Sequence, residues 1–589
     1  MSTGHRRLDL RYLRCDHHRR SAYTPAYTPD RQAVTGPEGS DTVDKIRVRW
    51  LMAIAIALAL ATGGVVYAAH DNPSAEATES EFDADHPDRA NPEGEEEGEE
   101  EAVADPAAKG TGPVAFTVAG HSAFIDTRTL PAAPPTRRPP KAETELRETG
   151  AQGTGPAAPV QTAVTAAAAP SPTVNALGLD FQNWGAGWPP DTNGVVGPNH
   201  FVQTVNTSIG IFAKSTGARV SAFTFDTFFA NSGTAECDAN NGGDPTVAYD
   251  VPSGRWVIAD FAWINYNKGP FYECVAVSSG SDPVASTWTF YSIPAGDGSF
   301  PDYPKFGSGP DAVYFTTNNF RHNSYVGSGV YALRRTTLGS PSLQVLHVTT
   351  SSSFFSLLPA NTVEAAPAAG PEVIASIWSG KISVWNMTPN WTAPASTTFV
   401  NTANLAVSYS SVGRIPTPGE QVDSLSPRVM NKAQLQGGSL WLSHTVAAGS
   451  TAGVRWYEVS NASTSPAIRQ QGTYAPADGL YRWMPSLAVD KQGNMAVGYN
   501  AANSSTNPAI RYAGRLVADP LGTLGQTETT LIAGTGAPST GNYNRWGDYS
   551  EMSVDPVDGC TFWFTTEYYA TTGSNWQTRI GSFKYPGCV

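Results

Sequence analysis

The sequence predicts an all-β protein, a β-propeller that follows a membrane segment and a disordered linker. From residue 176 onward, short alternating apolar runs such as 256–262 and 561–565 are bounded by Gly, Pro, Asn and Asp, a pattern typical of β-strands. No long helical periodicity interrupts these runs, so we expect antiparallel strands without helical crossovers. A strand-opening segment also recurs at intervals that fit four-stranded blades.

The N-terminal region carries the signals for export. Residues 1–49 are polar and basic, and residues 50–69 contain no charged side chain. A helix of that length spans about 30 Å, one hydrocarbon core, and its basic flank predicts a cytoplasmic N-terminus. Residues 1–49 are thus a cytoplasmic leader or an overextended start of the reading frame. Two interpretations of 50–69 stay open, an uncleaved signal anchor and a signal peptide cut after 66–69.

Residues 70–175 are predicted to be a disordered linker. Their sequence is first acidic, nearly continuously so at 93–101, and then rich in Pro and Ala. An acidic block of this kind is typical of a solvated spacer, and too few large apolar side chains follow to offset the entropy of ordering. Only 114–125 resembles a strand. The net charge of −14 argues against a nucleic-acid partner, because phosphate binding needs clustered Lys and Arg.

Four cysteines follow the hydrophobic segment, and Cys15 precedes it. An even number on the exported side predicts two disulfides in an oxidising compartment. Three pairings are open to four cysteines, and we favour the one that is local in sequence, Cys237 with Cys274 and Cys560 with Cys588. Each bridge would then link neighbouring strands and stabilise the fold by roughly 3 to 4 kcal/mol.

The propeller is predicted over residues 176–589. Three segments, 245–250, 485–490 and 550–555, end in Asp and are followed by Gly three or four residues later. Such an Asp caps its own backbone, and the Gly supplies positive φ for a tight turn before the returning strand. Seven strand openings favour seven blades, the last completed by a strand from the N-terminal end of the domain, with six as the alternative. The anchors, 55 to 68 residues apart, are Pro190, Pro245, Pro304, Pro359, Pro427, Pro485 and Ser550.

Several motifs resemble those of sialidase-like proteins. Residues 281–288 and 553–563 are similar to the Asp-box of bacterial neuraminidase repeats, and 414–416 is similar to the Arg-Ile-Pro motif of that family. The whole of the propeller region resembles secreted members of this group, many of them without an assigned activity. For a catalytic member the resemblance implies three arginines, a Tyr–Glu nucleophile pair and an Asp acid/base. The candidates for the nucleophile and acid/base roles are Asp302, Tyr303, Asp548, Tyr549 and Glu551, and those for the arginines are Arg428, Arg482 and Arg545.

Residues at the start of the innermost strands are expected to converge around one mouth of the central channel. Carboxylates, arginines and flat aromatic faces in a shallow funnel suit a sugar, because carboxylates accept hydrogen bonds from hydroxyls and rings stack on pyranose C–H faces. The alternative is that these side chains cap blade ends and link neighbouring blades. The candidate ligand-binding residues are Asp244, Arg482, Trp483, Arg545 and Trp546.

No cofactor is expected, with calcium as the one metal for which the sequence offers ligands. The four histidines of the propeller are scattered without zinc-ligand spacing. Asp191, Asn193, Asp238 and Asn240 supply hard oxygen ligands at turns. The same residues also suit ordinary Asx turns.

Together these observations predict a monomeric, extracellular or membrane-anchored β-propeller that recognises a surface glycan or an extracellular protein through its channel mouth. Membrane contact is expected only through the N-terminal segment. The alternative is a carbohydrate-active, sialidase-like hydrolase that uses the same mouth.

Overall fold

The computed structural model describes residues 100–132, 135, 144–164, 167–230, 232–322, 324–363, 369–541 and 543–589. All of them belong to one compact unit, Glu81–Val589. The predicted leader and hydrophobic segment, 1–49 and 50–69, lie outside the described residues. Within the described ranges, no helix is long and apolar enough to cross a membrane.

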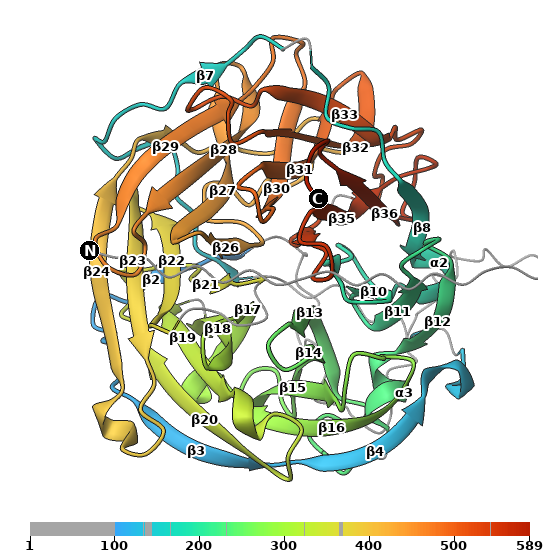
Figure 1. The fold of residues 1–589 in the computed structure, drawn as a ribbon, viewed down its shortest axis with the longest axis vertical. Helices are drawn as coiled ribbons and strands as arrows, with labels where there is room; N and C mark the ends of the chain where they lie inside the picture. Colours follow the sequence, from blue (N-terminus) through green and yellow to red (C-terminus); the bar gives the residue numbers. More distant parts are fainter. Residues whose placement is uncertain are drawn as a thin grey trace, which may run out of the picture. The chain divides into compact units, whose positions relative to one another are not determined.

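Antiparallel meanders follow one another around a common centre, which is the arrangement of a β-propeller (Figure 1). In the first, second and third meanders, each strand pairs with the next along the chain. Their strands are β9 (Asn193–Val196), β10 (His200–Val205), β11 (Ser208–Ala213) and β12 (Arg219–Thr224); β13 (Asn241–Asp250), β14 (Arg255–Trp263), β15 (Phe271–Ser278) and β16 (Ala285–Pro294); and β17 (Phe300–Ser308), β18 (Ala312–Arg321), β19 (Ser324–Arg334) and β20 (Ser342–Thr349).

A nine-stranded sheet contains the next two meanders, because their inner strands β21 and β26 pair in parallel. Two more sheets complete the ring. The strands are β21 (Leu358–Asn361), β22 (Glu372–Trp378), β23 (Lys381–Thr388) and β24 (Thr398–Ala406); β26 (Ala433–Gln436), β27 (Ser439–Ala448), β28 (Thr451–Ser460) and β29 (Ala467–Tyr474); β30 (Tyr481–Val489), β31 (Met495–Asn503), β32 (Thr506–Arg515) and β33 (Gln526–Ile532); and β34 (Glu551–Val554), β35 (Thr561–Tyr568), β36 (Gln577–Lys584) and β8 (Val174–Asp180).

The remaining elements are short and lie outside the meanders. β1 pairs with β5, β2 with β19 and β6 with β25. Their bounds are β1 (Glu100–Glu101), β2 (Val103–Ala104), β5 (Thr144–Glu145), β6 (Ala151–Gln152) and β25 (Tyr409–Ser410); the helices are α2 (Phe181–Trp184) and α3 (Phe225–Phe229), with 3-10 turns η2 (Thr127–Thr129), η3 (Gly296–Gly298), η4 (Arg335–Thr337) and η5 (Pro394–Ser396).

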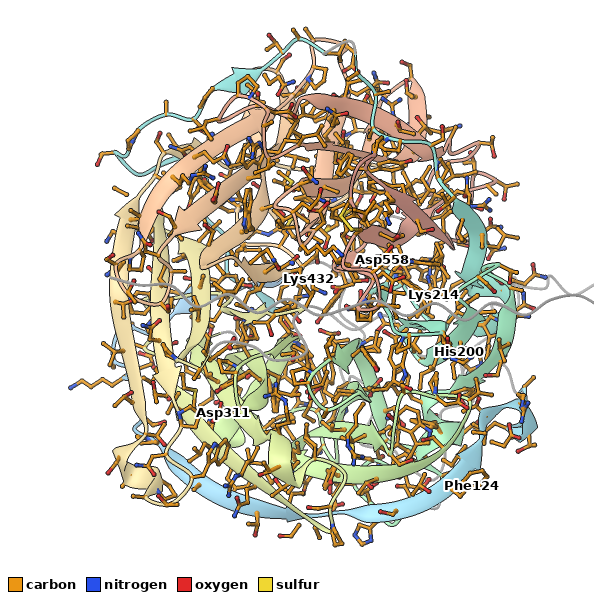
Figure 2. All side chains as sticks on the ribbon, viewed as in Figure 1. Phe124, His200, Lys214, Asp311, Lys432 and Asp558 are labelled. Carbon is orange, nitrogen blue, oxygen red and sulfur yellow. A yellow bond between two sulfur atoms is a disulfide. The ribbon has the colours of Figure 1, made fainter. Side chains whose placement is uncertain are left out.

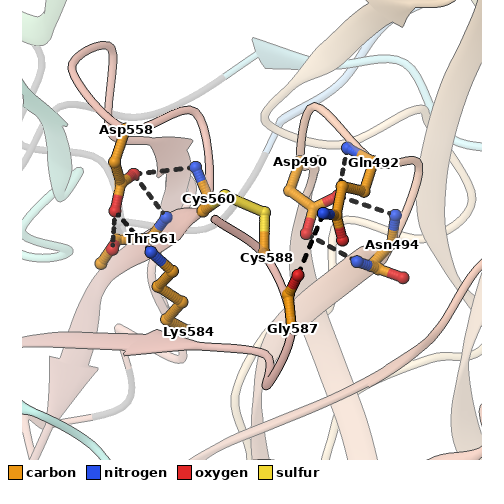
Figure 3. The surroundings of a disulfide bond; sticks show 9 residues. All are labelled: Asp490, Gln492, Asn494, Asp558, Cys560, Thr561, Lys584, Gly587 and Cys588. Carbon is orange, nitrogen blue, oxygen red and sulfur yellow. Dashed lines mark hydrogen bonds and ion pairs between the residues drawn. A yellow bond between two sulfur atoms is a disulfide. The ribbon is translucent and has the colours of Figure 1, made fainter.

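The hairpin turns expected after each Asp are present. Asp490 Oδ1 accepts hydrogen bonds from the backbone N–H groups of Gln492 and Asn494, both at 2.9 Å, and Gly493 has a φ of 85° (Figure 3). This positive φ is the conformation that glycine adopts at little cost. The local signal of Asp followed by Gly therefore predicts the turn between β30 and β31 correctly.

The prediction that residues 70–175 form a disordered linker is wrong for part of this segment. β3 (Val114–Ala119) pairs with β20, and β4 (His121–Asp126) pairs with β16, so this stretch runs along the outer edges of two sheets (Figure 1). Further on, β7 (Val160–Gln161) pairs with β29. An outer strand carries a row of unpaired backbone N–H and C=O groups, and an added strand satisfies them. The belt of strands β3 and β4 thus takes its order from edges that lie far away in sequence.

Both predicted disulfides form. Cys237 and Cys274 are bridged, as are Cys560 and Cys588, which are 28 residues apart. The second bridge ties the C-terminus to the turn before β35, where Asp558 Oδ1 accepts a hydrogen bond from the N–H of Cys560 at 2.8 Å (Figure 3). It lies beside the last meander, which β8 completes by pairing with β36.

The inner strands are joined to one another by side-chain to backbone hydrogen bonds. Asn193 Nδ2 donates to Pro245 O at 3.1 Å, across the first and second meanders. Gln434 bonds both backbone groups of Val489, each at 2.8 Å, across β26 and β30. Further bonds of this kind link Asn361 to Phe306 and Ala433, Asn431 to Pro485, Ser550 to Met484, Ser486 to Met552 and Ser553 to Val196.

We expect removal of the C-terminal disulfide to weaken the ring. The double change Cys560→Ser and Cys588→Ser should lower the free energy of unfolding by about 3 kcal/mol, because a loop of this length gains conformational entropy when it is no longer closed. Urea unfolding of the full chain measures the difference. Cys15→Ser, which leaves both bridges intact, is the control, and an unchanged midpoint in the double variant would contradict the expectation.

Candidate functional site

The chain enters the inner strands through residues with positive φ. Asp244, Tyr303, Met484 and Asp548 have φ values of 49°, 58°, 55° and 53°. The pairing of β13, β17 and β30 with their neighbours shifts register at the same places. Non-glycine residues adopt this conformation at a cost, and they do so mainly where the surrounding structure fixes them. These bulges set the direction of the side chains at one end of the channel.

Five residues, which we call the entrance cluster, meet at this end: Asp244, Tyr303, Lys305, Asp548 and Tyr549. The rings of Tyr303 and Tyr549 lie 5.0 Å apart. The Tyr303 hydroxyl donates to Asp548 O at 3.0 Å, and the Tyr549 hydroxyl donates to Asp244 Oδ2 at 3.3 Å. The structure therefore brings together four of the residues that the sequence predicts at the mouth.

Lys305 belongs to this cluster and was missed by sequence reasoning. Its Nζ lies 3.6 Å from the centroid of the Tyr303 ring and 2.9 Å from that of Tyr549, and its side chain is buried. Burial lowers the pKa of Lys305 well below its ordinary value, although Asp244 and Asp191 act to raise it. The only signal was its position two residues after Tyr303, on an inner strand that already carries the charged side chain of Asp302.

Tyr549 is held as a neutral phenol. Burial raises its pKa well above the ordinary value, and the nearby carboxylates of Asp244 and Asp191 raise it further. A tyrosine nucleophile requires the opposite shift, because the phenolate attacks. In this environment the Tyr549 hydroxyl acts as a hydrogen-bond donor.

Arginines gather beside the cluster. Arg545 forms an ion pair with Asp548, and the Arg428 guanidinium lies 5.1 Å from the centroid of the Tyr303 ring. Burial lowers the pKa of Arg147, opposed by Asp423 at 3.7 Å; the positive charges of Arg428, Arg414 and Arg545 lower it further. Arg428 and Arg545 thus contact the cluster, and their charges act on Arg147.

Arg482, Trp483 and Trp546 are not at the ligand-accessible surface, contrary to their predicted role. All three side chains are fully buried. Arg482 forms ion pairs with Asp478 at 2.6 Å and with Glu528 of β33 at 2.9 Å. The two tryptophan rings pack 5.4 Å apart in the core. They hold the blade together, which is the alternative that the sequence left open.

Glu551 and Asp302 lie near the cluster in different settings. Glu551 begins β34 and forms an ion pair with Lys432. Burial raises the pKa of Glu551, and the Lys432 ammonium acts to lower it. Asp302 is buried on β17, next to Tyr303, and its negative charge is among the causes that raise the pKa of Tyr549.

The predicted calcium ligands fall into two places. Asp191 is one of the charges that act on Lys305 and Tyr549, and Asn193 begins β9. Asp238 and Asn240 lie after Cys237, where Asn240 Nδ2 donates to Ala235 O at 3.4 Å. Among the residues that the structure describes, no group of three or more His, Cys, Asp and Glu is arranged to hold a metal ion. Calcium therefore stays a prediction.

A stack of three aromatic rings flanks the mouth and was also missed. Phe181 and Trp188 lie 4.8 Å apart, and Trp188 and Tyr543 lie 5.3 Å apart with an interplanar angle of 14°. Trp188 and Tyr543 are partly exposed. Trp188 precedes Asp191 and Tyr543 precedes Arg545 by only a few residues, so the stack adjoins the segments that lead into the entrance cluster. Tyr543 lies more than 350 residues from Trp188 in the sequence, so no local pattern indicates that their rings stack.

Glu567 lies beneath the segment 545–549. Its Oε2 accepts a hydrogen bond from the N–H of Gly547 at 2.9 Å, and the side chain is buried. Burial raises its pKa to about 8. The raised pKa favours the neutral carboxyl group of Glu567, which supports the backbone that carries Asp548 and Tyr549.

The fold and the channel mouth define a β-propeller with a polar entrance. No family model matches the chain, and neither does any curated protein sequence.

Solved structures with a similar outline include an exo-β-1,3-galactanase from Clostridium thermocellum, with 10% identity, a TM-score of 0.28 and coverage of 60% of this chain and 64% of that one. Drosophila Semaphorin 1b, extracellular domains 1–2, has 7% identity, a TM-score of 0.33 and coverage of 70% and 87%. The GH43 endo-arabinanase from Bacillus licheniformis has 8% identity, a TM-score of 0.23 and coverage of 54% and 92%.

We expect Arg482→Gln to be strongly destabilising. The change leaves Asp478 without its ion-pair partner and Glu528 with Arg511 alone, and breaking a buried pair costs about 3 to 5 kcal/mol. Urea unfolding measures the loss. Arg128→Gln removes a solvent-exposed pair with Asp126 and should have a much smaller effect, because water screens exposed charges; equal effects of the two changes would contradict a structural role for Arg482.

We expect Glu567→Gln to flatten the pH dependence of stability. A carboxyl group whose folded pKa is raised contributes stability that is present below about pH 4.5 and is lost as the pH rises through about 8. The variant cannot ionise, so relative to the wild type it should gain stability, on the order of a few kcal/mol, between pH 5 and pH 8. Urea unfolding at both pH values tests this, and parallel losses in the two proteins would contradict it.

Proposed function

We propose that this protein is an exported β-propeller that binds a surface glycan or an extracellular protein at the entrance of its channel. The observation that carries the proposal is the partly exposed stack of Trp188 and Tyr543, together with the buried entrance cluster, whose residues come from β13, β17 and the segment before β34. Carboxylates, guanidinium groups and aromatic rings meet there from segments more than 200 residues apart. The two disulfides fit an oxidising, extracellular compartment.

A glycan suits the chemistry of this face best. The partly exposed stack of Trp188 and Tyr543 offers an aromatic surface next to charged groups, the combination with which proteins bind pyranose rings. Hydrolysis is the weaker candidate, because the pKa of Tyr549 is raised and Glu551 is already paired with Lys432. A sialidase-like origin and an N-terminal membrane anchor or signal peptide belong to the same proposal.

We further propose that the ring consists of seven blades and that the protein acts as a monomer. Each of the inner strands β9, β13, β17, β21, β26, β30 and β34 begins one meander, and the nine-stranded sheet counts as two blades joined by the β21–β26 pair. The last blade takes β8 as its outer strand, as expected for a ring closed by an N-terminal segment.

The full chain, applied to a glycan array and to a panel of fluorogenic glycosides, tests the proposal. Tyr543→Ala should weaken binding of the retained glycan about tenfold, because a lost stacking contact is worth about 1.4 kcal/mol. Phe124→Ala is the matched control, since Phe124 is 70% exposed on β4 of the belt, away from the mouth (Figure 2). Retention of no glycan would leave extracellular protein as the ligand, whereas equal losses in both variants would contradict the proposed site.

Hydrolysis of a fluorogenic glycoside would favour the alternative function, a carbohydrate-active hydrolase. Asp302→Ala and Asp548→Ala remove two carboxylates of the mouth, and circular dichroism checks that each variant is folded. If either change abolishes turnover in a folded protein, the mouth is a hydrolase site and the binding proposal is wrong. Binding without turnover supports it.

A further inference from the structure

The N-terminal region passes beside the channel mouth at residues 146–152, which we call the strap. Leu146 is buried in an apolar cluster of the ring. Glu148 accepts a hydrogen bond from the Tyr409 hydroxyl at 3.0 Å, and β6, at the end of the strap, pairs with β25. The backbone of the strap is therefore fixed on both sides of Arg147.

Arg147 lies next to the rim of the mouth. Its Nη2 is 3.7 Å from Asp423 Oδ2, and the N–H of Asp423 donates a hydrogen bond to Asn544 O at 2.8 Å. Asn544 stands between Tyr543 of the aromatic stack and Arg545 of the mouth. A backbone hydrogen bond thus connects the carboxylate that Arg147 faces to the rings proposed to bind a glycan.

The two oxygens of the Asp423 carboxylate have different surroundings. Oδ1 accepts hydrogen bonds from the N–H groups of Ser424 and Leu425. Oδ2 is buried and receives no hydrogen bond within the described ranges of the chain, because the distance to Arg147 is longer than a hydrogen bond. Asp423 is only 7% exposed, and buried polar atoms are almost always hydrogen-bonded. Its Oδ2 therefore indicates a place for a further donor.

The contact that covers this oxygen is weak. The Arg147 side chain is 34% exposed, so water screens its attraction to Asp423. Three like charges also act against it, those of Arg428, Arg414 and Arg545. A partly exposed side chain that faces three like charges turns towards solvent at little cost, whereas the backbone of the strap stays anchored.

We propose that Arg147 is a gate over a subsite at Asp423, where a sugar unit of the bound glycan displaces the Arg147 side chain and donates a hydroxyl hydrogen bond to Asp423 Oδ2. This inference rests on the glycan binding proposed for the mouth and adds a residue and a mode of regulation to it. A hydroxyl suits the place, because hydrogen bonds to ionised acceptors are strong. The nearby arginine charges repel a cationic group. The Tyr543 ring offers its face to the same sugar.

Two variants that break the same ion pair test the gate in the full chain. The probe is an array of neutral gluco-, galacto- and manno-oligosaccharides, on which each variant is titrated. Arg147→Ala leaves the Asp423 carboxylate open and should tighten binding of the retained oligosaccharide about threefold, since a partly exposed pair is weak. Asp423→Asn keeps the acceptor for Ser424 and Leu425 but removes the charge, so it should weaken binding about tenfold. Arg128→Ala, which breaks an exposed pair beside β4, is the matched control and should leave binding unchanged.

The salt dependence of binding is a second readout, and it does not require Asp423→Asn to fold. Salt screens a partly exposed ion pair, so binding by the wild type should tighten between about 50 mM and about 500 mM NaCl. Binding by Arg147→Ala, which has no gate, should stay constant. An equal salt response of the two proteins would overturn the gate.

The outcomes separate the gate from the glycan proposal. Affinity changes of the same sign in Arg147→Ala and Asp423→Asn, or no change in either, would overturn the gate, because a purely structural pair has the same effect from either side. If Tyr543→Ala still weakens binding in that case, the glycan proposal stands. Retention of no oligosaccharide by the wild type and by Arg147→Ala would overturn the gate together with the glycan proposal.

Discussion

The hydrogen bonds between neighbouring inner strands are the constraint on which the rest of this structure depends. An inner strand pairs with its own blade on one side only, so its other edge would leave backbone groups unsatisfied next to the channel. Side chains from the adjacent blade supply the missing partners, as Asn193 does for Pro245 and Gln434 does for Val489. These bonds fix the register between blades. They also fix where the chain bends at Asp244, Tyr303 and Asp548, and hence which side chains meet at the mouth.

Backbone groups at the outer edge of the ring must also find hydrogen-bond partners, and here added strands supply them. There the unpaired backbone groups of β16 and β20 are met by β4 and β3, strands from a stretch too poor in apolar residues to fold alone. β8 completes the last blade in the same way. The N-terminal region thus belongs to the propeller through backbone pairing more than through hydrophobic burial. Because the belt and β8 pair with edges contributed by distant segments, their order depends on the ring being closed.

The sequence predicted what is encoded locally. The Asp–Gly turns, the strand runs and both disulfides depend on residues that are near one another along the chain or confined to few pairings. The strand-like run at 114–125 was visible in the sequence, but the edges with which the belt pairs lie 159 to 233 residues away, and no local pattern reveals them. For the same reason, only some of the residues predicted at the channel mouth were placed correctly. The position of Tyr303 and Tyr549 follows from the repeat, but whether Arg482 points to solvent or into the blade depends on Glu528 of a strand three strands along.

Burial gives the channel and its mouth different chemistry. At the mouth, Arg545 and Asp548 form a buried ion pair, whereas Trp188 and Tyr543 remain partly exposed, so these two rings can exchange water for a ligand. Within the buried entrance cluster, burial raises the pKa of Tyr549 and lowers that of Lys305, while nearby carboxylates act to raise both. The Tyr549 hydroxyl donates a hydrogen bond to Asp244, and Lys305 lies over the faces of Tyr303 and Tyr549. Recognition of a ligand therefore belongs to the partly exposed rings of the rim, whereas the buried cluster links β13, β17 and the segment before β34.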